Sequence, residues 1–327
     1  MAARDDSNML LSIVIVSWNT KHLLHDCLVS LQPELQGRQA EIFVVDNGST
    51  DGSPEHVESA FPDVILIRNK DNLGFSKANN LALRRCRGRY ICLVNSDIVV
   101  LPSCFDGLLT YMDQHPEVGV IGPRILNPDG TIQLSCFGVP NYWNMFCRVF
   151  ALDTLFPKTR LFGQRMMNYF DHSEVRKVDI LNGCFLMVRK EALQETGLLD
   201  ERFFFYGEDM DWCKRFRDRK WEITFYPESR AVHYGGASTA KSPIKYYIEM
   251  HRTDMQFWEK HYGRFGLCYI TAMLFLQQHL RLCGMGLLYL FGHSKREEAR
   301  HKIRRSVASI QWLFHHAGSR STRGREV

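Results

Sequence analysis

The chain has 327 residues, of which 45% are hydrophobic and 24% are charged, and its formal net charge is +5. This length is enough for one large domain or two, and the composition is that of an ordinary globular protein. The ten cysteines form no CxxC pair and have no metal-like spacing, which indicates a reducing compartment and excludes a disulfide framework. Cys92, Cys184 and Cys268 lie in apolar runs and are expected to act as small hydrophobes.

The two ends of the chain differ in charge. Residues 1–8 are polar and acidic, so no secretory signal peptide is expected. The C-terminal end is rich in Arg, Lys and His, which suggests a tail that meets an anionic surface.

The first hundred residues alternate between apolar, β-branched runs and short helical patterns. Thr20 is a candidate N-cap for a helix that reaches Leu31, and a second helix is expected to end near Arg85. This alternation predicts βαβ units with a parallel sheet, as in a nucleotide-binding half. The predicted strands span residues 10–17, 41–45, 64–67 and 90–94.

The strand at residues 90–94 is expected at the centre of the sheet, because a continuous apolar run is typical of a strand buried on both faces. Asn95 and Asp97 follow its carboxyl end, where open α/β sheets bind ligands. A carboxylate there suits a hard divalent cation held partly by a diphosphate. A simple polar turn is the alternative.

The pattern changes after residue 100. The turn Asn127–Gly130 between two apolar runs predicts a β-hairpin, and Asn182–Gly183 interrupts a later strand as a bulge or a close backbone approach. Residues 141–173 are aromatic and irregular and receive no assignment. The other predicted elements are a helix at 190–196 closed by Gly197, a helix that begins near residue 207, strands at 221–226 and 231–233, and a helix at 243–261.

Residues 267–291 are apolar, but polar residues from Gln277 to Arg281 divide them. Each half is shorter than the roughly twenty residues that span a bilayer. We therefore expect two short helices on a membrane surface, beside the basic stretch Lys295–Arg305. A buried helical hairpin is the alternative.

Carboxylates are the main candidates for chemistry. Asp46 and Asp97 each follow a predicted parallel strand, so both should lie at the same edge of the sheet. Asp46 could bind a ribose or base, or could form an Asx turn with its own backbone.

Three further acids lie in the segment from Glu208 to Asp211. A helix N-terminus attracts acids, and Asp211 can pair with Arg215 four residues later. Glu208 and Asp209 then remain for chemistry, since repulsion and partial burial raise the pKa of a carboxylate toward that of a general base. His233 precedes a glycine pair, although a lone His is more often structural.

Seven segments, taken in order, resemble the family 2 glycosyltransferases of GT-A fold, in particular the bacterial rhamnosyltransferase-like branch. They cover residues from about 10 to 260. The resemblance implies an α/β GT-A domain over residues 1–262, with a Rossmann-like nucleotide-binding half and a mixed central sheet. Residues 263–327 would be a helical, basic segment that associates with membranes. The segments are SIVIVSWN (12–19), VVDNGSTDGS (44–53), NLGFSKANN (72–80), LVNSD (93–97), NGCFLMVRKEA (182–192), LDERFFFYGEDMDWCKR (199–215) and VHYGGAS (232–238).

The resemblance also implies roles for single residues. Asp97 matches the metal ligand, and His233 matches a position that can complete the metal shell. Asp209 matches the catalytic base, with Glu208 beside it. The chain has Asn95 where many relatives have the first Asp of Asp-x-Asp, so the metal should bind weakly without the sugar nucleotide. The implied nucleotide-binding residues are Ser17, Asn19, Asp46, Asn47, Asn72, Gly74, Lys77, Asn95 and Ser96.

The implied activity is inverting sugar transfer in a single displacement. The cofactor would be Mg²⁺ or Mn²⁺, and the donor a nucleotide-diphosphate sugar such as dTDP-L-rhamnose. The acceptor would be a lipid-linked or cell-surface glycan. The protein would be cytoplasmic and peripheral on the inner face of the cell membrane, with an anionic membrane surface and no nucleic acid as partner.

Two other functions are the alternatives to sugar transfer. A nucleotidyltransferase of similar sheet topology would carry a Gly-rich, basic loop after the first strand, and residues 17–21 offer none. A catalytically inactive sugar-nucleotide or carbohydrate-binding module would bind the donor without turnover, but Asp97, Asp209 and His233 are all present.

Overall fold

The computed structural model describes residues 9–235, 243–291 and 296–323. The chain divides into two units, one formed by Met1–Val139 and Met166–Ala240 and the other by Pro140–Arg165 and Lys241–Val327. This division differs from the predicted boundary after residue 262. Residues 243–262 group with the C-terminal helices, and their helix is joined at Gly263 to the helix that continues to Phe291.

The first unit is built on a mixed sheet of nine strands. These strands are β1 (Leu11–Ser17), β2 (Ala40–Asp46), β3 (Ile65–Arg68), β4 (Tyr90–Asn95), β5 (Ile98–Val100), β6 (Val118–Leu126), β8 (Arg176–Lys177), β10 (Phe185–Arg189) and β11 (Glu222–His233). Their order is β3-β2-β1-β4-β10-β6-β11-β5, and β8 pairs with β11. The first four are parallel, whereas β10 runs antiparallel to both β4 and β6.

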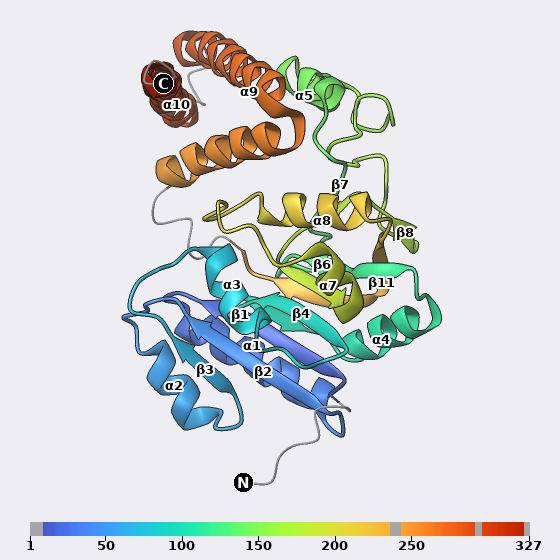
Figure 1. Ribbon diagram of the computed structural model, residues 1–327. Helices are drawn as coiled ribbons and strands as arrows, with labels where there is room; N and C mark the ends of the chain where they lie inside the picture. The colour runs from blue at the N-terminus through green and yellow to red at the C-terminus, as the bar shows by residue number, and fades with distance from the viewer. Residues whose placement is uncertain (1–8, 236–242, 292–295, 324–327) are drawn as a thin grey trace. The chain divides into compact units, whose positions relative to one another are not determined.

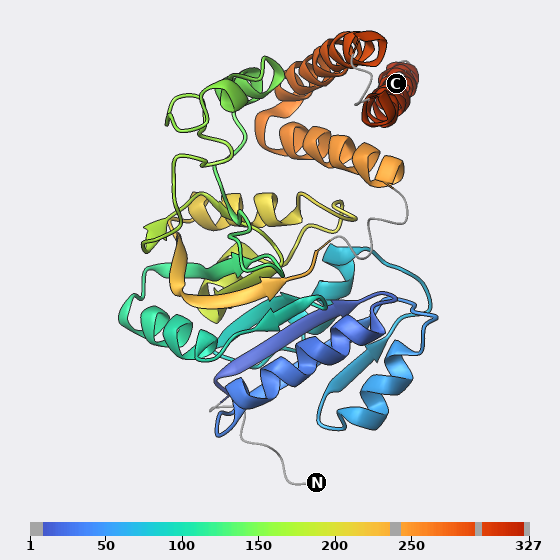
Figure 2. The same ribbon diagram turned by 180° about the vertical axis from the view of Figure 1, so that it is seen from behind.

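Helices cover both faces of this sheet (Figure 1, Figure 2). Alternate residues of β1 face opposite sides, so Ile13 packs in one core cluster and Val14 in the other. The cluster around Ile13 contains residues of α1 (Lys21–Leu35), α2 (Ser53–Ala60) and α4 (Cys104–Gln114). The cluster around Val14 contains residues of α3 (Phe75–Leu83), α7 (Lys190–Thr196) and α8 (Glu208–Asp218).

The N-terminal βαβ pattern is confirmed, with strand ends that differ from the predictions by at most one residue. The helix at 190–196 is also confirmed, and Gly197 follows it with φ of +82°. The two strands predicted at 221–226 and 231–233 form one strand, β11, with a register shift between Tyr226 and Arg230.

The predicted hairpin is only partly correct. The Asn127–Gly130 turn forms, and an isolated antiparallel bridge joins Leu126 to Ile132. However, β7 (Cys136–Phe137) pairs with β9 (Ile180–Leu181) and not with β6. The backbone N–H of Asn182 donates to the carbonyl of Ser135 at 2.8 Å and extends this pairing.

The second unit consists of α5 (Tyr142–Val149), α6 (Leu152–Leu155), α9 (Pro243–Phe291) and α10 (Arg296–Arg323). Helix α9 bends at Gly263, whose φ of 65° and ψ of −161° lie outside the helical region. Within this unit α9 packs against α5 and α10.

The prediction of two short helices in residues 267–291 is wrong. The helix continues through Gln277 and Gln278, which are both buried. The Gln278 carboxamide donates to the Tyr247 hydroxyl at 3.0 Å, so the polar residues pack inside the unit instead of breaking the helix. Across the described ranges, no helix combines the length and the apolar character needed to cross a bilayer.

All ten cysteines are free. Cys92 and Cys184 are buried as expected, but Cys268 is exposed. It lies on the same side of α9 as Phe265, which is also exposed, so an apolar run in the sequence does not mark the buried face of this helix.

Candidate active site

The strand pairings place the predicted site residues along one edge of the first unit. β1 pairs with β2 so that Ser17 lies beside Asp46, and it pairs with β4 so that Val16 lies beside Asn95. Adjacent strands are about 4.8 Å apart, so the ends of β2 and β4 are separated only by the end of β1. This places Asp46 and the turn after Asn95 at the same edge, as the sequence predicted.

A row of hydroxyl groups connects these strand ends. The Thr20 hydroxyl lies 3.0 Å from the Ser17 hydroxyl and 3.0 Å from the Ser96 hydroxyl. Thr20 occupies the N-cap position of α1, but its side chain makes no capping hydrogen bond. Its hydroxyl instead joins β1 to the turn that carries Asp97.

Asp46 combines the two roles left open by its sequence. One carboxylate oxygen, Oδ2, accepts from the backbone N–H of Ser49 at 3.1 Å, as in a local turn. The other, Oδ1, is buried and accepts no hydrogen bond within the described part of the chain. A buried acceptor needs a donor, so Oδ1 fits a ligand N–H or O–H.

Asn19 ties the end of β1 to the loop after β2. Its backbone N–H donates to the Ser49 hydroxyl at 2.9 Å, and its side-chain oxygen accepts from the backbone N–H of Thr50 at 2.8 Å. Asn19 has a φ of +54°, in the left-handed region that Asn tolerates. It therefore shapes the loop that follows Asp46.

Asn47 and Asn72 hold the next loop. The Asn47 carboxamide donates to Asn72 Oδ1 at 2.9 Å and accepts from the backbone N–H of Leu73 at 2.9 Å. Gly74 follows with φ of +81°, and a Cβ there would lie 2.5 Å from the carbonyl oxygen of Phe204. Asn47 and Asn72, which the resemblance implies as nucleotide-binding residues, thus position this loop against the segment that precedes Glu208.

Lys77 is an exposed side chain on α3. The hydrogen bonds from Asn80 and Arg84 lower the pKa of Glu201, and the charge of Lys77 lowers it further. Asn47 and Asn72 hold a loop of the site by hydrogen bonds, whereas Lys77 lies at the solvent-exposed surface of α3.

Asp97 and His233 form the closest pair of candidate ligands. The Asp97 carboxylate oxygen Oδ1 lies 3.2 Å from His233 Nε2, and the backbone N–H of Tyr234 donates to the Asp97 carbonyl at 3.0 Å. His233 Nδ1 lies 2.6 Å from the side-chain oxygen of Gln133. Since this oxygen only accepts, Nδ1 carries the proton.

Asp209 lies at the N-terminus of α8, close to the end of β4. Its Oδ2 accepts from the backbone N–H of Gly183 at 3.0 Å. The next residue, Cys184, accepts through its carbonyl from the backbone N–H of Asn95 at 2.9 Å. Burial, followed by the charges of Asp97 and then Asp209, raises the pKa of the Cys184 thiol. Gly183 and Cys184 thus bind the Asp209 carboxylate and the Asn95 backbone, which places Asp209 near the strand end that precedes Asp97.

Glu208 differs from Asp209 in its surroundings. Its side chain is buried, and Oε2 accepts no hydrogen bond from the residues described. Burial first, and then the Asp209 charge, raise the pKa of Glu208 well above its usual value. Burial and the neighbouring Asp209 charge thus both favour the protonated form of Glu208.

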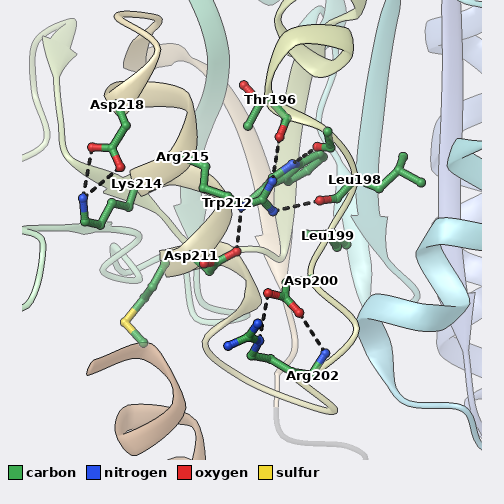
Figure 3. Close-up of polar contacts among 12 residues, drawn as sticks. Thr196, Leu198, Leu199, Asp200, Arg202, Asp211, Trp212, Lys214, Arg215 and Asp218 are labelled. Carbon is green, nitrogen blue, oxygen red and sulfur yellow. Dashed lines mark hydrogen bonds and ion pairs between the residues drawn. The ribbon is translucent and has the colours of Figure 1, made fainter. Parts of the chain in front are cut away.

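Asp211 is neutralised as the sequence predicted. Arg215 Nε donates to its carboxylate at 2.8 Å, and the other guanidinium nitrogens donate to the carbonyls of Thr196 and Leu198 (Figure 3). Asp211 is fully buried, so removing one partner would leave an uncompensated charge. This pair anchors α8 and keeps Asp211 apart from Glu208 and Asp209, the two other acids of the motif.

The donor set at Asp97 and His233 fits a divalent cation. Two neighbouring ligands, each about 2.1 Å from a metal, lie about 3 Å apart, close to the observed 3.2 Å. No cluster of three or more His, Cys, Asp or Glu side chains suited to a metal is found in residues 9–235, 243–291 and 296–323. For a cation bound at this place, Asp97 and His233 would be the two protein ligands, and a bound ligand or water would supply the others.

The sequence profile described as Glycosyl transferase family 2 matches residues 12–197. This is more than half of the chain. The chain belongs to this family. The match covers the strand ends with Ser17, Asp46 and Asp97, and family membership favours sugar transfer over nucleotidyl transfer.

Curated relatives agree with this family. An N-acetylglucosaminyl-diphospho-decaprenol L-rhamnosyltransferase of Mycobacterium tuberculosis is 27% identical over 78% of this chain and 86% of its own length. A low-salt glycan biosynthesis hexosyltransferase of Haloferax volcanii is 26% identical over 68% of this chain and 66% of its own length. The chain is thus a family 2 glycosyltransferase similar to rhamnosyltransferases.

Solved structures show the same fold. A mannosyltransferase of Pyrobaculum calidifontis, in complex with GDP-Man and Mn²⁺, matches with a TM-score of 0.54 and 15% identity over 95% of this chain and 89% of its own. Residues 1–349 of TarS from S. aureus match with a TM-score of 0.51 and 15% identity over 94% and 92%. Together with the mixed sheet and the C-terminal helices, these matches confirm the GT-A fold.

Some residues of the site were not singled out from the sequence. Gln133 contacts His233, 100 residues away, so no local pattern marks it. Thr20 was predicted only as a helix cap, and its contact with Ser96, 76 residues away, was not predicted. Gly183 was flagged as a close backbone approach, and its neighbour is Asp209.

Proposed function

We propose that this glycosyltransferase inverts the anomeric centre of its donor sugar and depends on a divalent metal. Its donor would be a dTDP-deoxyhexose such as dTDP-rhamnose, and its acceptor a lipid-linked or cell-surface glycan. The observation that carries the proposal is the Asp97–His233 pair, 3.2 Å apart, beside the Asp209 carboxylate at the edge where β1, β2 and β4 end.

The residues divide into three roles. Asp46, with its unpaired buried oxygen, would accept a hydrogen bond from the base or ribose of the nucleotide. Asp97 and His233 would hold Mg²⁺ or Mn²⁺, with oxygens of the donor diphosphate completing its shell. When bound, this metal would stabilise the negative charge that develops on the departing nucleotide diphosphate.

Asp209 would act as the general base. It would accept the proton of an acceptor hydroxyl while that oxygen attacks the anomeric carbon from the face opposite the leaving group. The bond to the nucleotide diphosphate breaks in the same displacement, so no covalent enzyme intermediate forms. Glu208 lies beside this base, and burial followed by the Asp209 charge raises the pKa of Glu208.

The choice of donor and acceptor is supported by the similarity of this chain to a rhamnosyltransferase. The relative in Mycobacterium tuberculosis is named for L-rhamnose transfer to an N-acetylglucosaminyl-diphospho-decaprenol. A polyprenyl-linked acceptor resides in a membrane, so this chain would work as a peripheral protein at the cytoplasmic face of the cell membrane. The net charge of +5 is favourable for contact with anionic lipids.

The test is a panel of nucleotide sugars, each incubated with the full chain, Mg²⁺ or Mn²⁺, and a polyprenyl-diphosphate N-acetylglucosamine acceptor. The proposal expects release of the nucleoside diphosphate and a product with inverted anomeric configuration. Donor binding without turnover across the panel would instead indicate a binding module. A retained configuration would exclude the single displacement.

A further inference from the structure

An exposed aromatic surface lies on the second unit, within residues 141–173, for which no helix or strand was predicted. Ring centroids connect its members in series: Phe150 to Phe146 at 4.6 Å, Phe146 to Trp143 at 5.8 Å, Trp143 to Phe162 at 6.1 Å and Phe162 to Phe156 at 5.3 Å. We call these five rings, together with Leu161, the aromatic patch.

The chain builds this patch by folding back beside α5, as both ribbon views show (Figure 1, Figure 2). The Trp143 indole N–H donates to the carbonyl of Leu161 at 2.8 Å, and the Asn141 side chain lies 3.3 Å from that of Gln164. Asn141 and Asn144 form a reciprocal capping box at the start of α5. The patch is therefore held by local hydrogen bonds rather than being a loose loop.

Its side chains remain open to solvent. Trp143 is 43% exposed, Phe156 is 49% exposed and Leu161 is 59% exposed. Large apolar side chains gathered at one place on a surface mark an interaction site. The polar atom of the indole is already hydrogen-bonded, so a partner needs to match only its apolar ring.

Positive charge surrounds this apolar surface. Lys158 and Arg160 are exposed and lie in the chain between Phe156 and Leu161. Arg148 and Arg165 are half-buried and act on the Asp254 carboxyl, whose pKa burial raises and their charges lower. Lys158 and Arg160 are therefore the basic side chains beside the patch. Aromatic rings beside Lys and Arg are the combination that enters the headgroup layer of a membrane, where the rings reach the acyl boundary and the cations meet lipid phosphates.

We propose that the aromatic patch is the surface by which this protein binds an anionic lipid bilayer. The inference deepens the proposed function, because it names the partner surface for an enzyme whose acceptor is lipid-linked. It also moves the expected membrane contact from residues 267–291 to residues 143–162. A second copy of the chain is a poorer partner, since a two-fold contact between patches would bring two surfaces of the same positive charge together.

The experiment measures binding of the full chain to vesicles of phosphatidylcholine, with or without phosphatidylglycerol, in the absence of donor and acceptor. The wild type should sediment with the anionic vesicles. The double variant Phe156→Ser/Leu161→Ser should bind about tenfold more weakly or worse, because two apolar side chains no longer enter the lipid. Lys158→Glu/Arg160→Glu should lose about 30-fold on anionic vesicles and little on neutral ones.

The matched control lies on α9. Leu287 and Leu290 are 60% and 62% exposed, so Leu287→Ser/Leu290→Ser removes as much exposed apolar surface outside the patch. This control should bind like the wild type. Loss of binding in the control, with binding retained in Phe156→Ser/Leu161→Ser, would overturn the proposal in favour of α9.

A second experiment measures directly whether the aromatic patch enters the bilayer. Brominated lipids should quench the fluorescence of the wild type, and Trp143→Phe should lose most of that quenching while it still sediments. Unchanged quenching in Trp143→Phe would contradict insertion of the patch. A concentration-dependent dimer that Phe156→Ser/Leu161→Ser abolishes would reassign the patch to self-association. None of these outcomes depends on sugar transfer, so this inference and the proposed function can fail separately.

Discussion

His233 Nε2 faces the Asp97 carboxylate at 3.2 Å, while Gln133 accepts the proton of the other ring nitrogen. A neutral imidazole that donates from Nδ1 has its lone pair on Nε2. A lone pair and a carboxylate oxygen at this distance repel unless a cation or a proton lies between them. In the proposed function, Nε2 of His233 is therefore the atom that would bind the metal.

Gln133→Leu should weaken metal-dependent donor binding about 10-fold or more, because the ring loses the hydrogen bond that fixes its tautomer and orientation. Gln133→Glu keeps an acceptor at the same place and should restore most of the binding. Titration calorimetry of the donor with and without Mn²⁺ measures both variants. Equal affinities for wild type and Gln133→Leu would remove Gln133 from the metal site.

Asp97→Ala should remove the metal dependence of donor binding, because only His233 would then remain as a protein ligand. In the wild type, donor affinity should rise when Mg²⁺ or Mn²⁺ is added, whereas in the variant it should not. Asp171→Ala is the matched control, since Asp171 is an exposed acid that pairs locally with Ser173. A metal response that persists in Asp97→Ala would show that the cation binds elsewhere.

Glu208→Gln should make the protein more stable at neutral pH than the wild type. The pKa of Glu208 is raised in the folded state, so the wild type is most stable below the unfolded pKa of about 4.3 and loses stability as pH rises toward the folded pKa. A glutamine takes up no proton and avoids this loss. The difference in free energy of unfolding between variant and wild type, measured by urea denaturation, should grow with pH by at most about 1.4 kcal/mol per pH unit. A constant difference would mean that Glu208 is ionised when folded.

Gly183→Ala should lower kcat more than it weakens donor binding. A Cβ at residue 183 would lie 3.3 Å from the Cβ of Asp209, and the Gly183 N–H also holds the Asp209 carboxylate. A displaced base loses its alignment with the acceptor hydroxyl. Gly284→Ala is the control, because a Cβ there meets no atom within 4 Å. Unchanged kcat in Gly183→Ala would argue against a positioned base.

The elements that were predicted well are those with a strong local signal. The apolar runs at β1, β2 and β4 end abruptly in polar residues, so the positions of Asp46 and Asp97 at a common edge follow from the parallel sheet. Likewise Asp211 and Arg215 are four residues apart, and their pairing follows from helical geometry.

The errors arose where distant contacts decide the structure. β7 leaves the predicted hairpin because β9, more than forty residues later, pairs with it. The helix through Gln277 and Gln278 continues because Tyr247 satisfies a buried carboxamide. For the same reason the partner of His233 was not predicted, since Gln133 is 100 residues away.

The most direct test of the site is sugar transfer by Asp209→Asn. This variant cannot accept the proton of the acceptor hydroxyl, so kcat should fall by about 10² to 10⁴, while donor affinity measured by calorimetry should stay close to that of the wild type. Glu208→Gln provides the matched control and should keep most of the activity, because Asp209 and not Glu208 is the proposed base. A near-normal kcat in Asp209→Asn would contradict the account.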